Sequence, residues 1–254
     1  MDAIVDDLAA QHAELRALVE RCSESDWSRP TPCDGWDVAD VLLHLTQTDE
    51  FAVVSSAHGD VERFRSGFLG TRDERSLTVD AAAAAQVEAE RTIGGPAIAA
   101  RWERSSAALL AELRTGDPHR RVPWVAGLLS LHTLAATRLA EAWIHTGDIA
   151  TALGVELAPT NRLRAVTRLA WRTLPYAFER AGLTLSGPVA LDLEGPDGDR
   201  WHFSPDEPAA TTIRGRASEF CALAARRLEP GQTSLAGEGP DAAAVLELVR
   251  TYAL

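Results

Sequence analysis

The chain has 254 residues, of which 46% are hydrophobic and 24% charged, a composition typical of a globular protein with one large or two small domains. Its formal net charge of −12 argues against nucleic acid or an anionic membrane as a partner, because their phosphate groups would be repelled. All 25 basic residues are arginines, which excludes a Schiff-base lysine and a phosphate-loop lysine.

The N-terminal segment and the cysteines favour a cytoplasmic protein. Residues 1–19 are acidic and amphipathic, without the basic region and apolar core of a signal peptide. No apolar run in the sequence is long enough to predict a transmembrane helix. The three cysteines, Cys22, Cys33 and Cys221, are far apart, so neither a disulfide framework nor a thiolate zinc cluster is expected.

The first part of the chain has a helical pattern of apolar residues. We predict a helix over residues 3–22, followed by the turn-rich segment SRPTPCDGW. A second helix is predicted to begin near Trp36 or Asp37, with Asp34 as its N-cap.

A polar stretch over residues 55–78 has no clear period, and we interpret it as an irregular connection or a lid. Helical patterns then resume, and Gly154 is expected to end the longest of these helices. The further predicted helices cover residues 80–93, 97–115, 127–153 and 160–181.

After Gly187 the apolar residues alternate in the manner of strands. The segments VALDLEG and RWHFSP flank Pro196-Asp197-Gly198-Asp199, which predicts a β-hairpin. The remaining predicted elements are a strand at 210–213, a helix at 216–228, a strand at 233–237 and a helix at 241–252. The predicted fold class is therefore α + (α+β), with a helical domain over 1–158 and, over 159–254, a linking helix plus a small α+β domain.

The segment RLAEAWIHTGDIATALG, residues 138–154, contains the most informative spacing. Glu141 and His145 are four residues apart, so on a helix both side chains can point at one ion. Arg138 and Asp148 extend the same stripe by one turn in each direction. The stripe is either the solvated face of a mostly buried helix, which the spacing alone favours, or the lining of a polar cavity with two metal ligands.

A third ligand would have to come from another helix. His44 is our candidate, although taken alone it fits a surface or hydrogen-bonded histidine, and His12 on the first helix remains an alternative. A set of two histidines and one glutamate leaves coordination positions open, as in catalytic zinc sites. Such a site can acidify water, bind a thiol as thiolate or polarise a carbonyl group. For Cys33 we favour a small buried cap residue over a thiol with a lowered pKa.

Several segments resemble the mycothiol-dependent maleylpyruvate isomerase family, part of the larger DinB-like metalloenzyme group. They are TPCDGWDVADVLLHL, VPW and RLAEAWIHTGDIATALG, and the tail segments GPVALDLEGPDGDRWHF and IRGRASEFCALAARR are similar to that family's sterol-carrier-like C-terminal domain. The resemblance implies a DinB-like four-helix bundle followed by a small α+β domain. It also implies a divalent metal, typically zinc, bound by His44, Glu141 and His145.

The resemblance further implies mycothiol as thiol cofactor or co-substrate, and isomerase or S-transferase activity on a small electrophilic, unsaturated substrate. Arg138 and Asp148 would support the metal ligands, and Arg227, or Arg226 as the alternative, would lie near the substrate carboxylates. Two alternatives stay open, because fold kinship does not settle the reaction. The chain would then be a thiol-independent lyase, hydrolase or cyclase of the same fold, or a non-catalytic protein that binds a small ligand.

Overall fold

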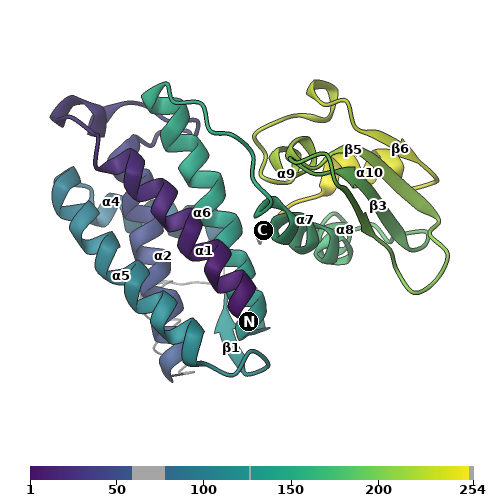
Figure 1. Cartoon of the computed structure of the whole chain (residues 1–254), viewed down its shortest axis with the longest axis horizontal. Coiled ribbons are helices and arrows are strands. Elements are labelled where there is room, and N and C mark those ends of the chain that lie inside the picture. The colour runs from purple at the N-terminus through teal and green to yellow at the C-terminus, as the bar shows by residue number, and fades with distance from the viewer. Residues whose placement is uncertain (59–77, 126, 252–254) are drawn as a thin grey trace. The chain divides into compact units, whose positions relative to one another are not determined.

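The computed structural model describes residues 1–58, 78–125 and 127–251 (Figure 1). These residues form two compact units that divide between Leu157 and Ala158. Most of the predicted irregular segment 55–78 lies outside the described residues, and its first four residues belong to a helix. No helix within the described ranges is long and apolar enough to cross a membrane.

The first unit is built mainly from helices, which Figure 1 shows in purple, blue and teal. Helix α2 packs against α5 and α6, and helix α1 packs against the same two helices. A short antiparallel hairpin, β1–β2, precedes α6 and contacts both α2 and α6. The elements are α1 (Asp2–Val19), η1 (Glu24–Ser28), α2 (Val38–His58), α4 (Val79–Glu90), α5 (Gly95–Thr115), β1 (Arg121–Trp124), β2 (Gly127–Ser130) and α6 (Leu131–Leu153).

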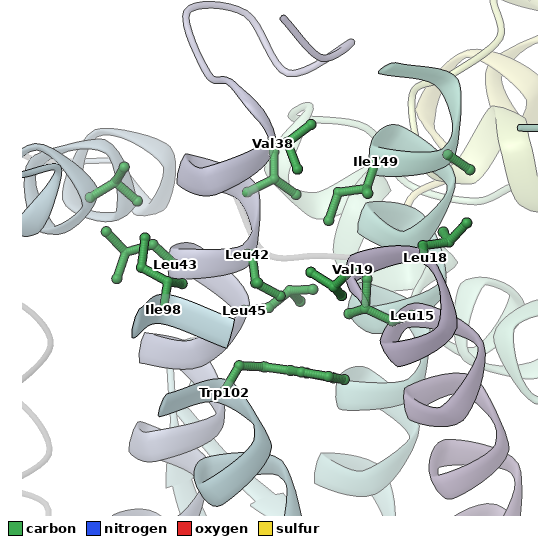
Figure 2. Close-up of a cluster of buried hydrophobic side chains, with 13 residues drawn as sticks. Leu15, Leu18, Val19, Val38, Leu42, Leu43, Leu45, Ile98, Trp102 and Ile149 are labelled. Carbon is green, nitrogen blue, oxygen red and sulfur yellow. The ribbon is translucent and has the colours of Figure 1, made fainter. Parts of the chain in front are cut away.

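A cluster of buried apolar side chains holds these helices together, because burying them removes apolar surface from water. Figure 2 shows side chains from four helices meeting above the indole of Trp102, which is 1% exposed. The labelled members are Leu15, Leu18 and Val19 from α1, Val38, Leu42, Leu43 and Leu45 from α2, Ile98 and Trp102 from α5, and Ile149 from α6.

The start of α2 corrects one expectation. Asp37, rather than Asp34, caps the helix: its Oδ1 accepts a hydrogen bond from the Asp40 amide at 2.9 Å, and Asp40 Oδ2 accepts one from the Asp37 amide at 3.1 Å. This reciprocal pair satisfies amide groups that have no partner within the helix. The TPCDGW segment stays outside the helix, as a loop closed by a bridge between Pro30 and Asp37.

Helix α6 begins later than predicted but ends where expected. Residues 127–130 pair with β1 instead of joining the helix, and Ser130 caps α6 by accepting a hydrogen bond from the Thr133 amide at 3.1 Å. Gly154 follows the last helical residue with φ of 70°, the left-handed conformation that glycine adopts most readily.

The second unit, drawn in green and yellow in Figure 1, is a four-stranded sheet with helices. The predicted hairpin is confirmed, because β3 pairs antiparallel with β4 from Leu191↔Phe203 to Glu194↔Arg200. The strand order is β4-β3-β5-β6, with β3 and β5 parallel. The elements are α7 (Leu163–Arg172), α8 (Leu174–Arg180), β3 (Val189–Glu194), β4 (Arg200–Phe203), β5 (Thr211–Arg216), α9 (Ala217–Ala224), η2 (Pro230–Gln232), β6 (Ala236–Glu238) and α10 (Ala242–Leu248).

The single helix predicted over 160–181 is two helices in the structure. Thr173 separates α7 from α8, and a proline follows at the start of α8. Proline lacks the amide hydrogen that would continue the helix, and it is tolerated in a first turn, where no partner is needed. The mixture of helical and sheet structure agrees with the predicted fold class at this coarser level.

Candidate metal centre

The three predicted ligands meet at one point inside the helical unit. His44 comes from the middle of α2, and Glu141 and His145 come from successive turns of α6. One potential ligand atom from each residue lies within 4.8 Å of the other two. His44 Nε2 is 2.8 Å from Glu141 Oε1, and the two imidazole rings lie 5.1 Å apart at an angle of 82°. His12, the alternative ligand, belongs to neither of the donor groups found among the described residues.

The stripe of polar residues on α6 faces the protein interior and not the solvent. The side chains of His44, Glu141 and His145 are only 10%, 26% and 12% exposed, respectively. Arg138 and Asp148, one turn further in each direction, are 0% and 2% exposed. The alternative of a solvated helix face is therefore wrong for this stripe.

Arg138 holds the carboxylate of Glu141 from the side opposite His44. Its Nη1 pairs with Glu141 Oε2, while its Nη2 lies 3.0 Å from Asp49 Oδ1 on α2. Burial alone would raise the pKa of Glu141, but Arg138, aided by His44, keeps that pKa well below its ordinary value. Glu141 is therefore an ionised carboxylate at neutral pH, as a metal ligand must be.

Asp148 fixes the imidazole of His145. Its Oδ2 lies 2.9 Å from His145 Nδ1, and because an ionised carboxylate only accepts hydrogen bonds, Nδ1 carries the proton. Burial lowers the pKa of His145, although Asp148 opposes this effect. The ring is therefore neutral, and its Nε2 lone pair is free for coordination.

Cys33 is a residue of the site whose place our sequence analysis missed. Its Sγ lies 3.1 Å from Asp148 Oδ2 and 3.7 Å from His145 Nδ1, and it is half-buried. Cys33, His145 and Asp148 also satisfy the distance criterion for a metal-binding group. The interpretation of Cys33 as a mere cap residue is wrong, since Asp37 caps α2. The position of Cys33 beside Asp148 and the candidate ligand His145 depends on tertiary folding, which the sequence pattern does not reveal.

Two tryptophans complete the surroundings of the site. The indole of Trp36 lies 5.1 Å from the His44 ring, tilted by 47°. Trp124, in β1, lies 6.0 Å from the guanidinium carbon of Arg138, close enough for a cation–π contact. The hairpin that the sequence analysis missed thus supplies one of the groups that hold Arg138.

Arg227, predicted to contact the substrate, belongs to the second unit. It follows α9, and its Nη1 donates a hydrogen bond to the Ala225 carbonyl at 3.1 Å. Arg226, the alternative, has φ of 59°, which is unusual for a residue other than glycine. A role for either arginine at the site stays a prediction.

The donor set fits a divalent cation such as zinc. It offers one ionised carboxylate and two imidazoles from two helices, which is a common combination for zinc with open positions. Each candidate ligand on α6 is hydrogen-bonded to a second side chain that orients it: Arg138 holds Glu141, and Asp148 holds His145. Together the fold and the site define a helical protein with a candidate open metal centre and an attached α+β unit.

Comparison with known proteins places the chain in a family. The family described as "Mycothiol maleylpyruvate isomerase N-terminal domain" matches residues 8–150. An uncharacterised protein of Mycobacterium tuberculosis, in strains CDC 1551 / Oshkosh and ATCC 25618 / H37Rv, is 33% identical over 251 residues, 98% of this chain and 95% of its own length. The chain therefore belongs to the mycothiol maleylpyruvate isomerase family, as its sequence motifs indicated.

Solved structures agree on the fold. The crystal structure of the mycothiol-dependent maleylpyruvate isomerase has a TM-score of 0.60 at 15% identity, over 95% of both chains. A mutant of that isomerase gives a TM-score of 0.61 at 14% identity, again over 95% of both chains. At this level of identity, the similarity shows a shared fold and does not by itself determine the reaction.

Proposed function

We propose that the chain is a metal-dependent enzyme that uses mycothiol as thiol cofactor or co-substrate, as an isomerase or S-transferase of a small electrophilic, unsaturated substrate. The observation that carries this proposal is the convergence of His44, Glu141 and His145. A three-ligand centre leaves room for a small molecule, whereas structural zinc sites are normally closed by four protein ligands. Family membership supports mycothiol as the thiol.

The proposal includes an assignment of the two domains. We take α1, α2, α5 and α6 as a DinB-like four-helix bundle and residues 1–158 as the metal-binding domain. Residues 159–254 would be the linking helix and sterol-carrier-like domain, with Arg227, or Arg226, directed to a substrate carboxylate. An arginine suits this task because its planar guanidinium can form paired hydrogen bonds with a carboxylate.

A divalent cation, which we expect to be zinc, would lower the pKa of the mycothiol sulfhydryl and hold its sulfur as thiolate at neutral pH. The protein contributes the geometry. Arg138 orients Glu141 and keeps it ionised, and Asp148 holds the His145 proton on Nδ1, leaving Nε2 for coordination. Both supporting groups are buried, so solvent does not compete for these hydrogen bonds.

The isomerisation would proceed by addition and elimination. The thiolate forms a C–S bond at one end of the double bond while the π electrons move toward a conjugated carbonyl. Rotation about the new single bond follows, and loss of the thiolate restores the double bond in its other geometry. In the S-transferase form a leaving group departs instead, with its bonding electron pair. Neither form requires an oxidant or a reductant.

Metal analysis of the purified protein, with His44→Ala and His145→Ala as variants, tests the centre. We expect about one zinc per wild-type chain and little in either variant, with folding of the variants checked by circular dichroism. Titration of cobalt-loaded protein with mycothiol then tests the thiol, because thiolate coordination produces a charge-transfer absorption band. No thiol binding at millimolar mycothiol would reject this proposal and favour a thiol-independent metalloenzyme.

A further inference from the structure

We propose that Cys33 is a positioning residue of the metal centre, which acts on the ligand His145 through the carboxylate of Asp148. This inference rests on the proposed metal site, and it adds a residue from a third segment of the chain, the loop before α2. The helical spacing of the ligands does not point to this thiol, because Cys33 lies outside both ligand helices.

The geometry places both donors on one oxygen atom. Asp148 Oδ2 lies 3.1 Å from Cys33 Sγ and 2.9 Å from His145 Nδ1. A carboxylate accepts and does not donate, so the thiol and the ring N–H both point toward this oxygen. Rotation of the Asp148 side chain would break both hydrogen bonds, and the thiol therefore helps to keep the carboxylate, and with it the ring, in place.

The backbone, and not the thiol, fixes the position of Cys33. Thr31 Oγ1 accepts a hydrogen bond from the Cys33 amide at 3.2 Å and donates one to the Trp36 carbonyl at 2.9 Å. The Trp36 amide donates to the Cys33 carbonyl at 3.0 Å. Arg91 ties the same loop to the body of the unit through the Gly35 carbonyl at 2.8 Å. Removal of the thiol should therefore leave the loop where it is.

Cys33 could instead bind the cation directly, since Cys33, His145 and Asp148 form a second potential donor group. That site would require His145 Nδ1 as the ligand atom. Nδ1 donates a hydrogen bond to Asp148. Coordination of a cation by Nδ1 and the Cys33 sulfur would therefore require the loss of this hydrogen bond and of the thiol proton. Coordination by His44, Glu141 and His145 also displaces one hydrogen bond, that of His44 Nε2 to Glu141 Oε1, but it leaves the thiol protonated and both hydrogen bonds to Asp148 intact. We therefore assign the cation to that group and the support of His145 to Cys33.

Loss of a group that supports a metal ligand typically weakens metal binding about 10–100-fold. In Cys33→Ala, Asp148 keeps its hydrogen bond to His145, so we expect zinc affinity to fall about tenfold. In Cys33→Ser a hydroxyl donor remains, and most of the affinity should return. Cys33→Val, which is close to cysteine in size but has no donor, should match the alanine variant and serves if alanine disturbs packing.

The test is chelator competition for zinc with the full-length protein, together with the visible spectrum of its cobalt form. Cys22→Ala is the matched control, because Cys22 is also half-buried but its Sγ contacts the Leu18 carbonyl, at 3.7 Å, instead of Asp148. We expect the control to bind zinc like the wild type. We also expect the cobalt spectrum to change in Cys33→Ala and Cys33→Val but not in Cys22→Ala.

Three results would overturn the inference. Wild-type zinc affinity in Cys33→Ala and Cys33→Val would show that the thiol does not support His145. A thiolate-to-cobalt band in the wild type without added thiol, lost in Cys33→Ala, would show that Cys33 is itself a ligand. Failure of the wild type to bind any metal would overturn the metal centre as well, and this result is distinguishable from the other two.

Discussion

Arg138 pairs with the carboxylates of Asp49 and Glu141 while its own side chain is completely buried. A charge in such a place is costly to desolvate, and it is stable only because both partners are held close to it. Burial raises the pKa of Asp49 to about 6, despite the opposing effect of Arg138. Asp49 therefore depends on this arginine for its ionised form.

Replacement of Arg138 should strongly lower the stability of the folded protein. In Arg138→Met the two carboxylates lose their common partner, and we expect the free energy of unfolding to fall by about 3–5 kcal/mol in urea denaturation. Arg114→Met is the control, because Arg114 forms an exposed pair with Asp6 at 3.9 Å and should cost less than about 1 kcal/mol. Equal effects in the two variants would contradict this account of Arg138.

His12 should make the helical unit sensitive to acid. Burial, together with the positive charges of Arg138 and Arg16, lowers its pKa from 6.5 to about 3. The unfolded chain therefore binds a proton between these two pH values while the folded chain does not. Stability from this group is present above pH 6.5 and is lost as the pH falls toward 3, by about 2 kcal/mol between pH 7 and 5.

The measurement is urea denaturation at pH 7, 6 and 5, the window that the lowered pKa defines, about 6.5 down to 3. His12→Leu cannot take up a proton in either state, and it also removes Nδ1, which has no hydrogen-bond partner among the described residues. The variant should lose less stability than the wild type on acidification. Parallel pH profiles for the two proteins would show that His12 does not contribute.

The candidate ligands on α6 could be predicted because helical spacing is visible in the sequence. Glu141 and His145 are four residues apart, and a helix turns such residues to one side. Cys33 could not be found in this way, because an irregular loop has no period and its thiol contacts residues more than a hundred positions away. The buried position of Arg138 was likewise invisible, since the spacing does not say which face of the helix is solvated.

At the scale of elements, the glycine within α6 and the glycine that follows it offer a paired test. Gly154 ends the helix with φ of 70°, whereas Gly147 lies within it, and an added Cβ would meet nothing within 4 Å at either position. Gly154→Ala should therefore destabilise the protein by about 1 kcal/mol, from backbone conformation alone. Gly147→Ala should stabilise it by about 0.5–1 kcal/mol, because alanine favours the helix.

Thermal denaturation of both variants checks these signs. Helical content from circular dichroism should stay near that of the wild type, because neither substitution introduces a clash. A stabilising effect of Gly154→Ala would show that the helix does not need the left-handed residue at its end.

Prediction of the elements succeeded for most helices and for the β3–β4 hairpin, and it failed for the β1–β2 hairpin and for the division between α7 and α8. The amphipathic helices and the β3–β4 hairpin were expected, with ends displaced by a few residues. Strands β1 and β2 were missed because the GLLS segment, residues 127–130, continues the apolar pattern of the following helix and was assigned to it. The division between α7 and α8 was missed because proline permits either a kink or a new first turn.

At the scale of the whole molecule, the chain divides its candidate functions between two units. All of the candidate metal ligands and their supporting groups lie in the first unit, and the arginines assigned to the substrate lie in the second. The order of a helical domain and an α+β domain could be predicted, because the period of apolar residues changes along the chain. The pairing of β3 with β5 could not, since strand order depends on contacts between distant segments.

Because the candidate metal ligands and the arginines assigned to the substrate lie in different units, substitutions should affect zinc affinity and turnover separately. Arg227→Ala should leave zinc affinity unchanged while lowering turnover about 10–100-fold, because a charge-assisted hydrogen bond to substrate is lost. His145→Ala should abolish both. Metal competition measures zinc affinity, and a steady-state assay with mycothiol and a small unsaturated substrate that the wild type converts measures turnover. Full turnover in Arg227→Ala together with a loss in Arg226→Ala would transfer the role to the neighbouring arginine.

The rings of Trp36 and His44 lie 5.1 Å apart, so the fluorescence of Trp36 should report whether the metal centre is occupied. A paramagnetic ion such as cobalt quenches indole emission at short range, so loading of the centre should lower the emission of Trp36 strongly and that of Trp124, beside Arg138, to a smaller extent. Trp36→Phe should remove most of that response, although the other six tryptophans remain. Fluorescence can therefore follow occupancy of the centre in real time, without a label and without turnover.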